Sequence, residues 1–117
     1  CTGLGVLRRH PDGRWTKNEN SIKDKQALQK RILKNCSKLL KPGGALVYAT
    51  CTTEPEENED VVSSFLDRTG GAFVIDDPRP YLPEQAHVLV DRNGFFHTYP
   101  EALEMDGFFG ARLVRKA

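Results

Sequence analysis

The sequence predicts an α/β fold, because apolar runs typical of strands alternate with amphipathic segments typical of helices. The clearest strand is Ala45 to Ala49, a short apolar run that turn residues bound on both sides. Helical patterns flank it over residues 21–41 and 55–68, and a second apolar run covers residues 72–75. Because strand, helix and strand follow in this order, we expect a parallel pair of strands with a right-handed crossover. The first run does not alternate with polar residues, so both of its faces should be covered.

Length and composition bound the class of protein. A chain of 117 residues supports one small domain over residues 1–117. No apolar run approaches the roughly 20 residues of a membrane span, and no signal peptide is visible. Three cysteines without metal-binding spacing favour separate thiols in a reducing cytoplasm and no metal site. The chain starts without Met, so we expect it to be a fragment of a longer protein.

Charge is distributed unevenly along the chain. Residues 1–41 carry eleven Lys or Arg against three acidic residues, whereas the remainder carries six basic against thirteen acidic residues. A basic first third indicates a polyanionic partner such as RNA. The alternative is that the Lys-rich helix is only a solvated face.

The segment before the first helix is punctuated by glycines and a proline, and should be irregular. It places cations beside an aromatic ring, a mixture that can hold phosphates and stack on a base. The predicted RNA-binding residues are Arg8, Arg9, His10, Trp15 and Lys17. The alternative is a surface loop whose Trp15 fills part of the core.

The first helix should begin at Ser21 as N-cap, with Asp24 three residues later. Its apolar residues recur every three or four positions on one face: Leu28, Ile32, Leu33, Cys36, Leu39 and Leu40. Cys36 lies on this stripe and is therefore assigned to the core. The sequence Lys41-Pro42-Gly43-Gly44 should end the helix.

Cys51 directly follows the strand at Ala45 to Ala49. Open α/β sheets bind their ligands at this end of their strands. Thr53 is the expected N-cap region of the next helix, and Pro55 suits its first position. A thiol at a strand end and near a helix N-terminus is a candidate nucleophile. The alternative is an inert cysteine that packs as a small apolar residue.

The C-terminal third should contain a loop, a small hairpin and a last strand. Three prolines mark the loop near residues 78–83, and Asn93-Gly94 is typical of a hairpin turn between residues 87–90 and 95–98. Residues 106–114 should form the last strand. His87 and His97 are isolated, which favours ordinary structural roles for both.

Four blocks of sequence then converge: Thr2-Gly3-Leu4-Gly5-Val6-Leu7-Arg8-Arg9-His10-Pro11-Asp12, Tyr48-Ala49-Thr50-Cys51, Pro55-Glu56-Glu57-Asn58-Glu59 and Met105-Asp106-Gly107-Phe108-Phe109-Gly110-Ala111-Arg112-Leu113. Together they resemble the Sun/Fmu/Nol-type RNA cytosine-5 methyltransferases, in that family's order. The resemblance implies the C-terminal part of a Rossmann-like, S-adenosylmethionine-dependent methyltransferase fold, a mixed sheet with flanking helices. The implied substrate is rRNA or tRNA.

The resemblance also implies roles for two cysteines. Cys51 matches the family's nucleophile, which adds to the target cytosine. Cys1 matches a second cysteine that assists product release, although the Asp-Ala-Pro that precedes it in the family is missing here. The family's Gly-rich loop and cofactor-binding acids should lie upstream, so we expect no S-adenosylmethionine site in this fragment and no activity from it alone.

Two other classes of function remain open from the residues themselves. The chain could be a non-catalytic RNA-binding α/β module, or a structural domain that binds another protein. Reactivity of Cys51 separates the enzyme from both alternatives, and salt-sensitive RNA binding separates the last two. A fragment of a sheet should also expose an unpaired edge, which favours self-association.

Overall fold

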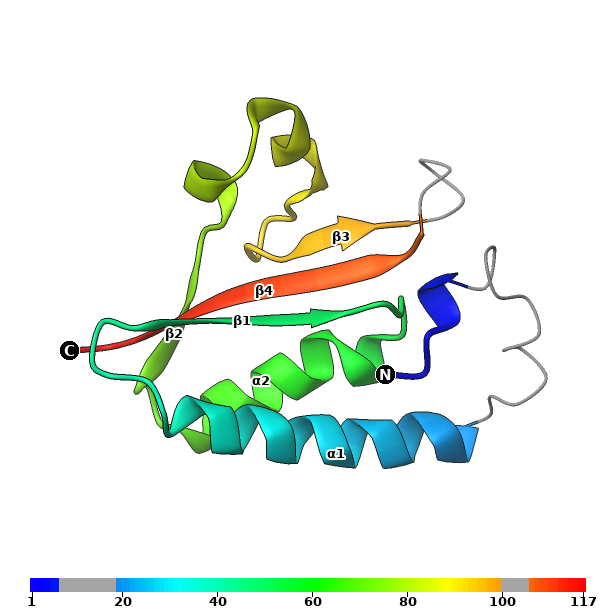
Figure 1. The fold of residues 1–117 in the computed structure, drawn as a ribbon, viewed down its shortest axis with the longest axis horizontal. Helices are drawn as coiled ribbons and strands as arrows, with labels where there is room; N and C mark the ends of the chain where they lie inside the picture. Colours follow the sequence, from blue (N-terminus) through cyan, green and yellow to red (C-terminus); the bar gives the residue numbers. More distant parts are fainter. Residues whose placement is uncertain (7–18, 100–105) are drawn as a thin grey trace.

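The computed structural model describes residues 1–6, 19–99 and 106–117, which form one sheet covered by two helices (Figure 1). The helices are α1 (Glu19–Ser37) and α2 (Glu59–Arg68). The strands are β1 (Ala45–Thr50), β2 (Phe73–Asp76), β3 (Phe96–Thr98) and β4 (Phe108–Arg115). Short 3₁₀ helices cover Leu4–Val6, Pro55–Glu57, Arg79–Tyr81 and Glu84–Leu89.

The C-terminal strand β4 is the centre of the sheet. It pairs antiparallel with β1, β2 and β3, in the order β1-β4-β2 with β3 beside β4. The expected neighbouring parallel pair is therefore wrong. Strands β1 and β2 do run in the same direction, because both oppose β4, but β4 lies between them. A crossover pattern fixes the relative direction of two strands and leaves room for a third one between them.

Strand β1 is covered on one face only, which corrects the expectation that both faces are buried. Its exposure alternates: Tyr48 and Thr50 are buried toward the helices, whereas Val47 keeps 68% of its surface exposed. The alternating residues of β4 that face the helices, Phe109 and Leu113, are almost fully buried. The core thus lies between one sheet face and the two helices (Figure 1).

Helix α1 begins at Glu19, two residues before the expected cap, and only part of its apolar stripe reaches the core. Leu33 and Ser37 are buried, but Ile32 is 52% exposed. Cys36 is exposed, so its assignment to the core is wrong. The stripe is wider than the surface that α2 and β1 present to it, and the residues on its margin remain uncovered.

The approach to α2 differs from the sequence expectation. Pro55 opens a 3₁₀ turn, and α2 starts only at Glu59, with Asn58 rather than Thr53 at its N-cap position. Asn58 makes no side-chain cap hydrogen bond to the helix, because its amide bonds to the preceding loop instead. Cys51 is consequently separated from the α2 N-terminus by a folded loop.

The expected hairpin forms only in part. A turn at Gly94, with φ of 88°, leads into β3, but residues 84–89 form a 3₁₀ helix and Val90 contributes one isolated bridge to Phe96. Strand β3 pairs with β4 instead. The amides of Ala86 and Val90 donate to the Pro83 and His87 carbonyls at 2.9 and 3.1 Å, so they are not available to a strand pair.

Candidate functional site

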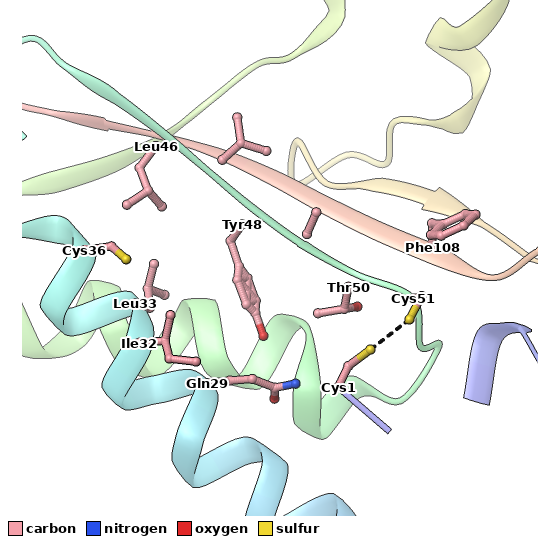
Figure 2. Close-up of a pocket in the computed structure, with 12 residues that line it drawn as sticks. Cys1, Gln29, Ile32, Leu33, Cys36, Leu46, Tyr48, Thr50, Cys51 and Phe108 are labelled. Atoms are coloured by element: carbon pink, nitrogen blue, oxygen red, sulfur yellow. Dashed lines mark hydrogen bonds between the residues drawn. The ribbon is translucent and has the colours of Figure 1, made fainter. Parts of the chain in front are cut away.

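The two candidate catalytic cysteines lie side by side, although fifty positions separate them in the chain. The Sγ atoms of Cys1 and Cys51 are 2.9 Å apart (Figure 2). Cys1 is exposed and Cys51 is half-buried, and both are free thiols. The pair sits at the carboxyl end of β1, the edge where α/β sheets place reactive groups.

A network of buried polar groups fixes the loop that carries Cys51. Thr50 Oγ1 donates to Asn58 Oδ1 at 2.5 Å, and Asn58 Nδ2 donates to the Thr52 carbonyl at 2.9 Å. The Thr52 hydroxyl accepts from the Glu54 amide at 3.2 Å. Thr52 and Asn58 are almost completely buried, so breaking these bonds would leave buried polar atoms unpaired. The loop therefore holds Cys51 in one position.

Residues 1–6 cross this loop and bring Cys1 to it. The Thr2 amide and hydroxyl donate to the Glu57 carboxylate at 2.8 and 2.6 Å. The Gly5 amide donates to the Cys51 carbonyl at 2.9 Å, and the Gly5 carbonyl accepts from the Gly107 amide at 2.5 Å. A Cβ on Gly5 would lie 2.0 Å from the Gly107 oxygen, so only glycine permits this approach.

A groove of about 600 Å³ opens beside the cysteines, between α1 and the edge of β1 that does not pair with β4. Figure 2 shows the Tyr48 ring and the Gln29 side chain in it, next to the sulfur pair. Half of its lining residues are apolar: Ile32, Leu33, Leu46, Val47, Ala49 and Phe108. An apolar groove with two thiols at one end suits a planar base or a packing segment of protein.

Ionisable groups near the cysteines are shifted by their surroundings. Burial and the nearby Glu57 carboxylate raise the pKa of Tyr48 well above its usual range, so its hydroxyl stays protonated and donates to the Glu57 carbonyl at 2.5 Å. Partial burial, followed by repulsion from Glu56 and Glu57, raises the pKa of Glu54. Tyr48 therefore acts here as a fixed hydrogen-bond donor.

Comparison with known proteins identifies the family of the chain. The family described as 16S rRNA methyltransferase RsmB/F matches residues 1–114. The chain belongs to this RsmB/F family. The match confirms the resemblance drawn from the four sequence blocks, and both cysteines lie within the matched range.

Matches to individual known proteins extend over almost the whole chain. Ribosomal RNA small subunit methyltransferase B of Salmonella paratyphi A is 40% identical over 116 residues, which are 99% of this chain and 24% of that protein. The solved structure of PH0851 has a TM-score of 0.84 at 30% identity, over 98% of this chain and 25% of that one. NSun6 from Pyrococcus horikoshii with SFG has a TM-score of 0.77 at 26% identity, over 100% of this chain and 28% of that one. The chain thus spans about a quarter of each of these proteins.

These likenesses confirm the predicted fold class, the C-terminal part of a Rossmann-like methyltransferase fold with flanking helices. The sheet pairs seen in the described part of the chain are all antiparallel, because they all involve β4.

The predicted RNA-binding residues Arg8, Arg9, His10, Trp15 and Lys17 lie outside the described residues. The structure shows a second cationic feature that the sequence only hinted at. Lys30 and Lys34 of α1, together with Lys38 just after the helix, meet Arg68 at the end of α2 around a cavity of about 330 Å³. Periodicity placed the lysines on one helix, but only the packing of α2 adds Arg68.

The described residues do not fit the nucleoside part of S-adenosylmethionine. No glycine-rich turn follows a strand in residues 19–99 or 106–117. The groove beside the cysteines contains no acidic residue in its lining that could bind ribose hydroxyls. The expectation that this fragment holds no cofactor site stays a prediction.

The two histidines in the described part lie away from the sulfur pair. His87 Nε2 lies 2.8 Å from the Arg79 carbonyl oxygen, and His97 Nε2 lies 2.9 Å from Asp91 Oδ2. Among the described residues, no group of three His, Cys, Asp or Glu side chains could hold a metal ion. The same residues include no helix that is long and apolar enough to cross a membrane.

Sequence reasoning found both cysteines but missed the residues that bring them together. Thr2, Gly5, Glu57 and Asn58 were noticed only as parts of motifs, without a role. The usable signal was a dense run of carboxylates and an amide at residues 54–59, of which two members are completely buried. Nothing local in the sequence shows that their partners lie in residues 1–5.

Proposed function

We propose that this chain is the C-terminal part of the catalytic domain of an RNA cytosine-5 methyltransferase that acts on rRNA or tRNA in the cytoplasm. One observation carries the proposal: two free thiols 2.9 Å apart at the carboxyl end of β1, beside an open groove. The RsmB/F membership supplies the reaction class, and the name of the Salmonella relative supplies ribosomal RNA as substrate.

The chemistry explains the need for a thiol. C5 of cytosine is a poor nucleophile. When the Cys51 thiolate adds to C6, an Sγ–C6 bond forms and the electron pair of the C5–C6 double bond makes C5 nucleophilic. After C5 has been methylated, a base removes the C5 proton. The electron pair of that C–H bond re-forms the C5–C6 double bond, the Sγ–C6 bond breaks, and Cys51 leaves as a thiolate. The methyl group would come from S-adenosylmethionine, which upstream parts of the protein would bind.

Cys1 is placed to act on the same adduct. Its Sγ lies 2.9 Å from the Cys51 sulfur, so it reaches the atoms around C6 once the adduct has formed. It is also more exposed than Cys51, which leaves room for the nucleic acid. We assign attack to Cys51 and assistance of release to Cys1.

Cys51 lines a groove. The target base must therefore leave its stack to reach the thiol. Phosphate contacts by Arg8, Arg9 and Lys17, with Trp15 and His10 beside a base, would support the extruded nucleotide. The cationic cavity at Lys30, Lys34, Lys38 and Arg68 offers a further phosphate surface on the helical side.

Substitutions in the full-length protein test the proposal. We expect Cys51→Ala to abolish cytosine-5 methylation, because the variant lacks the thiolate that adds to C6. Cys1→Ala should instead let a covalent RNA–protein adduct accumulate, visible as a slow band on a denaturing gel. Ser63→Ala is the control, since Ser63 is exposed on α2, lies outside the lining of the groove and should leave turnover unchanged. Full methylation activity of Cys51→Ala would overturn the assignment of Cys51 as the nucleophile.

A further inference from the structure

Glu57 is a completely buried carboxylate in a loop that otherwise serves the cysteines. Its oxygens accept three hydrogen bonds, from the Thr2 amide at 2.8 Å, the Thr2 hydroxyl at 2.6 Å and Gln29 Nε2 at 3.1 Å. No Lys, Arg or His in the described part of the chain forms an ion pair with it. Burying a carboxylate among neutral donors is costly, so a hydrophobic residue would suit stability better.

Two of the three donors belong to the residue that follows Cys1. The Thr2 nitrogen is part of the peptide bond that joins Cys1 to Thr2, so a bond to that nitrogen fixes the peptide plane next to the Cys1 Cα. The hydroxyl bond fixes the Thr2 side chain in addition. The third donor, Gln29, anchors the carboxylate to α1, and Gln26 Nε2 ties the same helix to the Glu56 carbonyl at 2.8 Å.

Cys51 is held by a different set of contacts. Thr50, Thr52 and Asn58 fix its loop without the Glu57 side chain. The Glu57 main chain does contribute, because its carbonyl accepts from the Tyr48 hydroxyl. A change confined to the Glu57 carboxylate therefore acts on the Thr2 side of the sulfur pair.

We propose that Glu57 is a positioning residue that sets the place of the Cys1 thiol against Cys51 through its two bonds to Thr2. Glu57 touches neither sulfur nor substrate, because it is completely buried. The part of this inference that concerns release of the methylated base rests on the function proposed above. The geometric part does not depend on it.

Disulfide formation measures the geometric part directly in the full-length protein. Diamide removes two hydrogens from the Cys1 and Cys51 thiols, joins their sulfurs and is itself reduced to the hydrazine; peptide mapping quantifies the product. We expect Glu57→Ala to slow this reaction at least tenfold. Glu56→Ala, which removes the neighbouring exposed carboxylate, should leave the rate unchanged. An unchanged rate in Glu57→Ala would overturn the proposal.

A milder variant covers the case in which Glu57→Ala does not fold. Thr2→Val removes the hydroxyl that donates to Glu57 and keeps the shape of the side chain. We expect a two- to fivefold slower disulfide reaction in this variant once it has folded. A rate equal to that of the parent protein would overturn the proposal as well.

The RNA arm separates this inference from the proposed function. Glu57→Ala should accumulate the covalent RNA adduct as Cys1→Ala does, and the double variant should accumulate no more than Cys1→Ala alone. Loss of adduct formation in folded Glu57→Ala would show that Glu57 serves Cys51, against the proposal. If Cys1→Ala itself traps no adduct, the release role of Cys1 fails, and the disulfide rate still decides the position of Glu57.

Discussion

The amide of Gly5 donates a hydrogen bond to the carbonyl of Cys51 at 2.9 Å, and the carbonyl of Gly5 accepts from Gly107. Gly5 thereby joins three separate parts of the chain: the Cys1 segment, the Cys51 loop and the entrance to β4. The contact is main chain to main chain, which explains why no side chain fits there.

Gly5→Ala should destabilise the site strongly, because its Cβ would lie 2.0 Å from one backbone oxygen and 2.7 Å from another. We expect a loss of about 2–4 kcal/mol in the free energy of unfolding, measured by urea denaturation of the full-length protein. Gly110→Ala is the matched control, since its Cβ would meet nothing closer than 3.6 Å. Equal stability of the two variants would contradict the close approach.

RNA binding should depend on the basic first third of the chain. Reversing Arg8, Arg9 and Lys17 to Glu should weaken RNA binding and flatten its salt dependence, because fewer counterions are released from the phosphates. A plot of log affinity against log salt concentration measures this, with a slope smaller by about 2–3 if all three residues contact phosphates. An unchanged slope would place the contact surface elsewhere.

The cationic cavity gives a second arm of that experiment. Reversing Lys30, Lys34 and Lys38 tests this cavity without touching residues 7–18. The same charge change at Lys23, Lys25 and Lys41 of the basic segment serves as control, because these residues do not line the cavity. A larger effect of the first triple than of the second would assign phosphate contacts to the cavity.

The isolated 117 residues should bind S-adenosylmethionine negligibly and methylate nothing. The physical reason is the acid-free, apolar lining of the groove beside the cysteines. Calorimetric titration of the isolated chain checks this, with the full-length protein as the positive control. Micromolar binding by the isolated chain would show that the donor site lies within these residues.

The isolated chain should also self-associate. Within the described residues, β1 pairs only with β4, so its other edge offers free backbone groups beside the exposed side chains of Val47 and Ile32. We expect a dimer in sedimentation experiments at high concentration, weakened by Val47→Lys. Val88→Lys is the control, because Val88 is 85% exposed in the distant 3₁₀ segment. A strictly monomeric parent chain would contradict the exposed edge.

Local pattern determined a large part of this structure. The apolar run before Cys51 and the final strand were predicted within two residues of their observed bounds. The two helices were predicted less closely, since α1 ends at Ser37 instead of Lys41 and α2 starts at Glu59 instead of Pro55. Each depends on residues near one another in the chain, which periodicity records directly. The four motif blocks, taken in order, also identified the family, whereas the catalytic roles of the two cysteines stay a prediction.

Only the tertiary structure decided which segments meet. Periodicity does not encode strand order, so it missed the insertion of β4 between β1 and β2 and the one-sided burial of β1. It placed Cys36 in the core because an apolar stripe shows what a helix can bury, whereas the neighbouring elements decide how much it does bury. The bond from Thr2 to Glu57, and with it the contact between Cys1 and Cys51, exists because folding brings the ends of a fifty-residue span together.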